Sequence, residues 1–321
     1  MLAEFDLIRQ FFTTDAGDGV ALGVGDDATL LTPSAGQQLV VSVDTSVVDV
    51  HFPARAPAHA IGHRALAVAL SDIAAMGATS RWCLMALALD QREWPDEASI
   101  SAWMKDYAHG FLALSGKHET ALVGGDVTSG QLAISVTVMG EVPTGQALTR
   151  SGARPGDIIA VTGALGGGAG GLHLWQQGER DLSHPLLERY LLPMPRLAAG
   201  QALRGLASAA LDISDGLLAD LGHLRRASGV GAHLEMEALP LAEGLMEALG
   251  LSNARQAALS GGDDYELLIS LPPENWAAAQ SALAELCIPL TPIGRCIDTA
   301  GVRGVMSERQ DGWQHFVGET P

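Results

Sequence analysis

The sequence predicts an α/β fold in two domains, and three observations carry that prediction. The chain has 321 residues, 47% of them hydrophobic, so it can bury a substantial core and is long enough for two domains. Short apolar runs typical of strands alternate with longer segments of helical periodicity. Between Pro143 and Pro155 the composition turns to Gly, Thr, Ser, Arg and Pro, which indicates a boundary. We therefore expect an N-terminal domain over 1–142 and a C-terminal domain over 143–321.

The N-terminal domain is predicted to alternate helices and strands, with acidic residues near their ends. A short helix opens the chain, and residues 39–43 form a buried strand that runs directly into Asp44. A long helix is expected over about 57–76, because its apolar residues recur at helical spacing and Gly77 suits its C-cap. The remaining expected elements are a strand at 82–89, a helix at 99–114, a strand at 121–123 and a strand at 132–142.

The C-terminal domain shows a similar alternation, interrupted by a glycine-rich segment. Residues 163–171 lack both the Gly-Lys-Ser/Thr of a P-loop and a clear dinucleotide fingerprint. We interpret them as a tight turn from a strand into a helix, whose amides remain candidates for phosphate contact. The other expected elements are strands at 157–161, 211–213 and 267–271 and a helix at 216–227.

The charge of the chain excludes two classes of partner. The net charge is −18, from 37 acidic and 19 basic residues. Nucleic acid and anionic lipid both require clustered Lys and Arg, so we expect neither a nucleic-acid partner nor a membrane partner. Lys105 and Lys117 are the only lysines, and neither follows a glycine-rich turn.

The cysteines and apolar segments indicate the cytoplasm. No apolar run reaches the 18 or so residues that a membrane span needs, and the start lacks the features of a signal peptide. The three cysteines, Cys83, Cys287 and Cys296, are odd in number and lack zinc-ligand spacing. They are typical of reduced thiols in a cytoplasmic protein.

Acidic side chains cluster where strands run into loops, mostly beside glycine. Glycine at such a junction lets backbone N–H groups approach a phosphate, and in open α/β sheets ligands lie beyond the carboxyl ends of strands. One further aspartate, Asp72, lies on the long helix. The junction residues are Asp26, Asp27, Asp44, Asp126, Asp212, Asp215, Asp263 and Asp264.

Taken together, these carboxylates predict a metal–phosphate site. Each one alone has an ordinary explanation, because Asp favours turns and Asp215 could cap the helix that Gly216 opens. Asp72 is harder to explain, because it lies among small residues toward the negative end of its helix, where burying a carboxylate without a cation is costly. Mg²⁺ prefers carboxylate oxygens and bridges to substrate phosphates, so it could bind an anion such as ATP to this acidic chain. Arg150 is a candidate for additional phosphate charge.

Seven short motifs occur in order along nearly the whole chain. They are GVGDDA at 23–28, SVDT at 42–45, LSDIAAMG at 70–77, GGD at 124–126, LTRSG at 148–152, DISDGL at 212–217 and SGGDDYEL at 260–267. As a set they resemble the thiamine-monophosphate kinases, a family in the superfamily of aminoimidazole ribonucleotide synthetase. The resemblance implies two α/β domains, with N-terminal strands that form a barrel across a homodimer.

The resemblance also implies the reaction. It is the ATP-dependent phosphorylation of thiamine phosphate to thiamine diphosphate, by direct in-line transfer assisted by several Mg²⁺ ions, as the last step of thiamine diphosphate biosynthesis. A phosphate monoester has its second pKa near ~6, so it is already an ionised nucleophile at neutral pH and needs no general base. We accordingly assign no catalytic side chain.

Residue by residue, the resemblance implies three sets of contacts. The metal ligands fall on Asp27, Ser42, Val43 through its backbone, Asp44, Asp72, Asp126, Asp212 and Asp215. The ATP contacts fall on Gly125, Asp126, Arg150 and Ser214, and those to thiamine phosphate fall on His51, Asp263 and Trp313.

The chain departs from the family pattern at two of these positions. The family usually has Glu where this chain has Asp263, which makes that substrate contact one methylene shorter. It usually has Thr where this chain has Val43, so only a backbone carbonyl is left as a ligand. Neither departure touches the central aspartates.

Three alternatives stay open at this point. A selenophosphate synthetase needs a reactive Cys in a glycine-rich N-terminal segment, whereas Cys83 lies in a strand-like run. A hydrogenase-maturation protein needs a C-terminal Cys, and this chain ends in Pro321. A non-catalytic acidic metal-binding protein would bind divalent cations without needing ATP.

Overall fold

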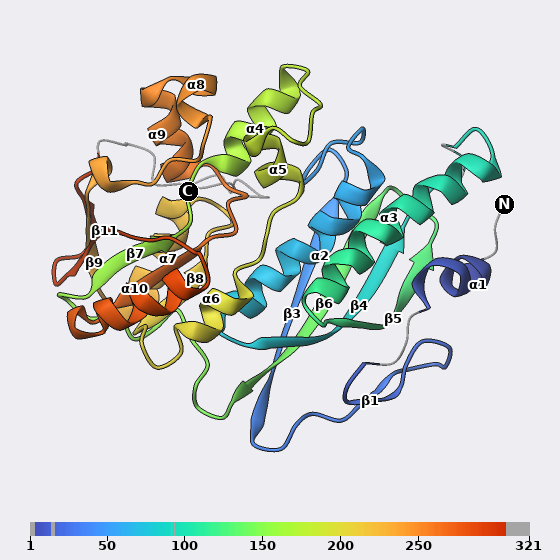
Figure 1. Ribbon diagram of the computed structural model, residues 1–321, viewed down its shortest axis with the longest axis horizontal. Helices are drawn as coiled ribbons and strands as arrows, with labels where there is room; N and C mark the ends of the chain where they lie inside the picture. The colour runs from blue at the N-terminus through green and yellow to red at the C-terminus, as the bar shows by residue number, and fades with distance from the viewer. Residues whose placement is uncertain (1–3, 14–16, 91, 93, 306–321) are drawn as a thin grey trace, which may run out of the picture. The chain divides into compact units, whose positions relative to one another are not determined.

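The computed structural model describes residues 4–13, 17–90, 92 and 94–305 (Figure 1). The chain separates into two compact units, each with its own sheet and helices. The first comprises Met1–Ile73 with Ala78–Gly145, and the second comprises Ala74–Gly77 with Gln146–Pro321. Both units mix helices and strands, so the α/β prediction is confirmed at that level.

A four-stranded sheet with the strand order β3-β6-β4-β5 forms the centre of the first unit. The β3–β6 and β4–β6 pairs are antiparallel, and β4–β5 is parallel. The first unit also holds the short segments α1 (Glu4–Leu7), a π-helical turn at Ile8–Phe12, β1 (Val20–Leu22) and β2 (Leu30–Leu31). The sheet strands are β3 (Gln37–Val47), β4 (Thr79–Ala88), β5 (Ala121–Thr128) and β6 (Ala133–Pro143).

Two long helices, α2 (Ala58–Ala75) and α3 (Glu97–Lys117), lie side by side over one face of this sheet (Figure 1). Leu66, Leu70 and Ile73 of α2 are fully buried, as their helical spacing predicts. The two helices touch through glycine, because a Cβ on Gly110 would lie 1.9 Å from the carbonyl oxygen of His59. Only glycine permits this close approach.

The second unit contains a six-stranded sheet with the order β12-β9-β11-β7-β10-β8. Every neighbouring pair is antiparallel except β12–β9. β7 and β10 are buried at every residue, because they lie inside the sheet. The strands are β7 (Ile158–Thr162), β8 (Ala209–Asp212), β9 (Gly231–Leu234), β10 (Leu267–Leu271), β11 (Leu290–Ile297) and β12 (Val302–Arg303).

Seven α-helices accompany the second sheet in the described part of the chain. Two of them, α4 (Gly167–Gln176) and α7 (Leu217–Ser228), begin beside loops that carry predicted site residues. The others are α5 (Pro185–Leu191), α6 (Leu197–Ala202), α8 (Leu245–Leu249), α9 (Leu251–Ser260) and α10 (Trp276–Glu285), with 3-10 turns at Met236–Ala238 and Pro273–Asn275.

The strand directions change one argument from the sequence. We placed the carboxylates at the carboxyl ends of strands by a rule for open parallel sheets, but both sheets are mainly antiparallel. Carboxyl and amino ends of neighbouring strands therefore meet at the same edge.

None of the helices in the described residues combines the length and the apolar character that a membrane span needs.

Candidate active site

Strand β3 places three predicted metal ligands in succession, and they point to alternate faces of the sheet. Ser42 and Asp44 pair with the buried Val138 and Val136 of β6, on the face that α2 covers. Val43 points to the opposite face and is 62% exposed. Its side chain is therefore directed away from the other two, which agrees with a role for its backbone alone.

Asp72 on α2 meets Ser42 of β3. The Ser42 hydroxyl donates a hydrogen bond to Oδ2 of Asp72, across 30 residues of sequence. Asp72 is half-buried in the last two turns of α2, between the fully buried Ser71 and Ile73. Helix α2 thus brings a carboxylate to a hydroxyl of β3.

Strand β5 carries Gly125 and Asp126 opposite Met85 and Ala86 of β4. Asp126 shares a cross-strand row with Ala86, Ser135 and Thr45, whereas Asp44 lies in the neighbouring row. Asp126 is exposed and Asp44 is half-buried. Gly125 is required as glycine, since it has a φ of 149° and a Cβ there would lie 1.9 Å from the Met85 carbonyl oxygen.

Two further predicted residues of the first unit lie in turns. Asp27 is exposed, and its amide donates to the Asp26 carboxylate at 2.8 Å. His51 follows β3, where its Nδ1 accepts the Val47 amide at 3.0 Å and its carbonyl oxygen accepts from Nε of the buried Arg64 at 3.2 Å. An Nδ1 that accepts an amide places the proton of a neutral imidazole on Nε2.

In the second unit, strand β8 ends at Asp212, and the loop after it holds Ser214 and Asp215. A residue that the sequence reasoning missed, Asp220, organises this loop: its Oδ2 accepts the amides of Ser214 at 3.0 Å and Asp215 at 3.1 Å. Burial, together with the charges of Asp212 and Asp215, raises the pKa of Asp220 to about 7. The only sequence signal was an acidic residue in the first turn of a predicted helix.

The loop before β10 lies against the loop after β8, because these two strands are antiparallel and Leu267 pairs with Asp212. The Asp263 amide donates to the Ser214 carbonyl at 2.9 Å, and the Tyr265 amide donates to the Ile213 carbonyl at 2.8 Å. The structure therefore brings the predicted substrate residue Asp263 next to the predicted ATP residue Ser214.

Glycine permits the close contact between these two loops. A Cβ on Gly262 would lie 2.4 Å from the Ser214 carbonyl oxygen. Asp263 and Tyr265 adopt left-handed conformations, with φ of 68° and 51°. Such conformations cost about 1–3 kcal/mol each and persist where surrounding contacts fix them.

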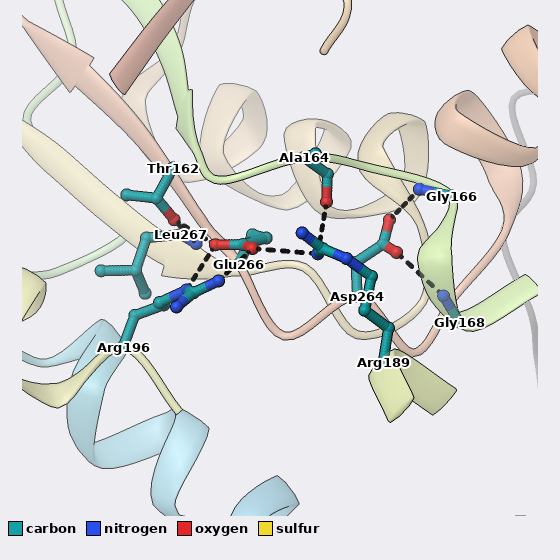
Figure 2. Close-up of polar contacts among 9 residues, drawn as sticks. All are labelled: Thr162, Ala164, Gly166, Gly168, Arg189, Arg196, Asp264, Glu266 and Leu267. Carbon is teal, nitrogen blue, oxygen red and sulfur yellow. Dashed lines mark hydrogen bonds and ion pairs between the residues drawn. The ribbon is translucent and has the colours of Figure 1, made fainter. Parts of the chain in front are cut away.

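The glycine-rich segment at the start of α4 is occupied by a side chain of the protein itself (Figure 2). The Gly166 amide donates to Asp264 at 2.8 Å, and the Gly168 amide donates at 3.3 Å. Burial raises the pKa of Asp264 to about 7. Two of the amides that the sequence left open for phosphate therefore bind a carboxylate.

A buried ion pair anchors the end of the loop that leads into β10. Glu266 is 1% exposed, and Figure 2 shows it facing the guanidinium of Arg196, which donates through Nε at 2.7 Å and Nη2 at 2.6 Å. The Thr162 hydroxyl donates to it at 2.7 Å, and Arg189 lies 3.5 Å away. Nothing in the sequence pattern joined these residues, because Arg196 and Glu266 are 70 residues apart and Thr162 and Glu266 are 104 apart.

Two predicted contacts remain, Arg150 and Trp313. Arg150 is exposed, and its carbonyl oxygen accepts the Ser228 hydroxyl at 3.1 Å. Trp313 lies outside the described residues.

Cys83 is fully buried in β4, where burial raises the pKa of its thiol to about 12, so it does not suit the reactive cysteine of a selenophosphate synthetase.

The predicted ligands suit Mg²⁺ by chemistry, because they offer carboxylate and hydroxyl oxygens. Asp212 and Asp215 lie close enough to raise the pKa of Asp220, and a divalent cation would relieve that repulsion. Among the described residues, no three His, Cys, Asp or Glu side chains converge into a preformed metal site. The metal assignments therefore stay predictions.

Comparison with known proteins agrees with the fold and with the motifs. Residues 25–142 match the N-terminal domain of the AIR synthase related proteins, and residues 154–307 match their C-terminal domain. The thiamine-monophosphate kinase of Salmonella typhimurium is 40% identical over an alignment of 329 positions, which covers 98% of each chain.

Two solved structures are also similar. The thiamine-monophosphate kinase of Stenotrophomonas maltophilia has a TM-score of 0.82 and 47% identity, over 89% of this chain and 91% of that one. AaThiL complexed with AMPPCP and TMP has a TM-score of 0.78 and 29% identity, over 97% of this chain and 94% of that one. The fold and the two domain matches define an AIR synthase related protein. Within that group, the chain belongs to the family of thiamine-monophosphate kinases.

Proposed function

We propose that this protein transfers the γ-phosphate of ATP to thiamine monophosphate, giving thiamine diphosphate and ADP. Its family membership supports the reaction, and so does the complex of AaThiL with AMPPCP and TMP. One contact within this chain gives the proposal its main structural support. The amide of Asp263, assigned to the thiamine substrate, bonds to the carbonyl of Ser214, assigned to ATP. Acceptor and donor nucleotide would thus be held by adjoining loops.

The reaction suits a site without a general base. The acceptor is a phosphate monoester, which is mostly ionised at neutral pH because its second pKa lies near ~6. The protein then has to align two polyanions and neutralise their charge, rather than remove a proton. We assign this alignment to Ser214 and Asp263 in the second unit, and to Gly125 and Asp126 in the first. Arg150, His51 and Trp313 complete the proposed contacts.

We assign Mg²⁺ to the carboxylates of both units. The proposed ligands are Asp27, Ser42, Val43 through its backbone, Asp44, Asp72, Asp126, Asp212 and Asp215. When bound, the metal supplies charge neutralisation for the phosphates of ATP and of the acceptor. The Ser42–Asp72 hydrogen bond supports this assignment in the first unit, because it brings two proposed ligands from different elements together.

The proposal extends to a homodimer in which the β3–β6–β4–β5 sheets of two copies form a barrel. Strand β3 lies at the edge of its sheet, where Leu39, Val41 and Val43 are 47%, 55% and 62% exposed. A long apolar edge strand is usually covered in a native protein. In this account residues 1–142 bind metal and ATP phosphates and form the dimer, while residues 143–321 bind ATP and substrate. The unpaired thiols of Cys83, Cys287 and Cys296 support a cytoplasmic location.

Chromatography of the reaction products tests the function. The protein is incubated with ATP, Mg²⁺ and thiamine monophosphate, and thiamine diphosphate is expected in amounts equal to the ADP formed. EDTA should abolish the product and excess Mg²⁺ should restore it. A protein that binds divalent cations but forms no thiamine diphosphate would instead support the metal-binding alternative.

A further inference from the structure

Tyr265 contacts the side chain to which we assign substrate recognition. Its hydroxyl donates a hydrogen bond to Oδ1 of Asp263 at 2.9 Å, within the loop that joins α9 to β10. Tyr265 is 8% exposed, whereas Asp263 is half-buried. A buried aromatic ring thus presents one hydroxyl group to a carboxylate that solvent reaches.

The backbone of this loop is fixed on both sides of Asp263. The Asp263 and Tyr265 amides donate to the carbonyls of Ser214 and Ile213, as described above. Asp264 lies between Asp263 and Tyr265 in the sequence, and its carboxylate accepts hydrogen bonds from amides at the start of α4. A Cβ on Gly168 would lie 2.5 Å from the Asp263 carbonyl oxygen, so α4 also limits movement of the loop. With the main chain fixed, the remaining freedom of Asp263 is rotation of its side chain.

We propose that Tyr265 is a positioning residue for the thiamine substrate, because its hydroxyl holds the Asp263 carboxylate in one orientation. This inference rests on the proposed function and deepens it. A hydrogen bond to a charged acceptor is stronger than one to a neutral acceptor, so it can select one side-chain orientation. The fixed carboxylate then serves as a preorganised acceptor for the polar or cationic part of thiamine monophosphate. Tyr265 acts through Asp263 and contacts no reacting atom.

Tyr265→Phe tests the proposal, because it removes one hydroxyl group and keeps the buried ring. The KM for thiamine monophosphate should rise about tenfold, which is within the range for a hydrogen bond to a charged group. The KM for ATP and the kcat at saturating substrate should stay within about twofold of the wild type. Tyr107→Phe is the matched control. This second buried tyrosine donates to the sulfur of Met85 in the first unit, so its loss should leave both KM values unchanged.

A double-mutant cycle separates action through Asp263 from a general effect on the loop. In an Asp263→Ala background, adding Tyr265→Phe should not change the KM for thiamine monophosphate further. The proposal is overturned if the Tyr265→Phe effect is equally large in both backgrounds, if it falls on the KM for ATP, or if Tyr265→Phe matches the wild type. Those outcomes leave the proposed function standing. If the wild-type protein forms no thiamine diphosphate at all, the proposed function fails and this proposal fails with it.

Discussion

The hydroxyl of Ser42 donates a hydrogen bond to the carboxylate of Asp72, which joins the edge strand β3 to the last two turns of α2. A carboxylate is unfavourable near the carboxyl end of a helix, because the helix dipole is negative there. Asp72 lies between the fully buried Ser71 and Ile73 and accepts a hydrogen bond from a strand hydroxyl. These contacts support the proposal that Asp72 binds a metal.

Asp72→Asn should therefore reduce kcat by at least about 100-fold, or about 2.7 kcal/mol of transition-state free energy. The amide keeps the size of the side chain but loses its charge. Melting of the metal-free variant should occur at or above the wild-type temperature, because a poorly solvated carboxylate has been neutralised. Steady-state kinetics and thermal melting check both parts. Glu285→Gln, at an exposed position of α10, is the control, and near-normal turnover of Asp72→Asn would remove Asp72 from the site.

The buried Glu266–Arg196 pair yields a prediction about stability. Arg196→Met leaves a carboxylate that is 1% exposed without its bidentate partner, which should cost about 3–5 kcal/mol of unfolding free energy. Adding Glu266→Gln should recover part of that loss, because the unpaired charge is then gone. Urea unfolding curves measure both changes. Equal stabilities for Arg196→Met and the wild type would mean that this pair does not anchor the loop before β10.

The raised pKa of Asp264 predicts that the free energy of unfolding depends on pH. Burial raises its pKa to about 7, with the charge of Glu266 adding to the effect, while the amides of Gly166 and Gly168 and the charge of Arg189 oppose it. An unfolded aspartate titrates near ~3.9, so between about pH 4 and 7 the folded state binds the extra proton. This contribution is fully present at low pH and is lost as the pH rises through about 7.

The variant Asp264→Asn cannot ionise, so its own stability lacks this contribution. The melting temperature of the wild type should fall relative to that of Asp264→Asn as the pH rises from about 5 to about 8. Thermal melting without metal or nucleotide measures the difference. A difference that stays constant, or that grows in favour of the wild type, would contradict the assignment.

Substitution of Asp263 tests the substrate contact. Asp263→Ala should raise the KM for thiamine monophosphate about tenfold or more, because a charged contact is lost. Asp263→Glu, the residue usual in the family, should retain most of the affinity. It should also melt slightly lower, since Asp tolerates the left-handed backbone at φ 68° better than Glu does. If Glu were as damaging as Ala, a carboxylate at this position would not be what the substrate requires.

Most helices and strands could be predicted from periodicity. Where their observed ends differ from the predicted ends, the reason is physical. The strand expected at 267–271 is β10 over the same residues, and the helix expected at 216–227 is α7 at Leu217–Ser228. The strand expected at 121–123 extends to Thr128, because Gly124 and Gly125 stay paired with Leu84 and Met85 of β4. Glycine usually signals the end of a strand, but here it allows close backbone approach.

Most residues assigned to the candidate site could be predicted from local motifs, but the contacts that anchor its loops could not. Asp220 and Asp264 were not predicted as loop anchors, although both carboxylates accept two backbone amides. Asp264 meets amides at the start of α4 that lie 98 and 96 residues away, and contacts between such distant segments leave no periodic signal in one sequence. Asp220 accepts amides only five and six residues before it, but an acidic residue in the first turn of a helix does not by itself reveal that contact. The same holds for the Tyr265–Asp263 contact, which depends on two left-handed residues.

Transfer of label from ATP tests the central claim most directly. The protein is incubated with Mg²⁺ and ATP labelled at the γ-phosphate, with thiamine monophosphate, free thiamine or no acceptor, and the thiamine species are separated. The account predicts label in thiamine diphosphate in the first reaction, and no labelled thiamine product in the other two. Label that appears only with free thiamine, or ADP released without any labelled thiamine product, would contradict it.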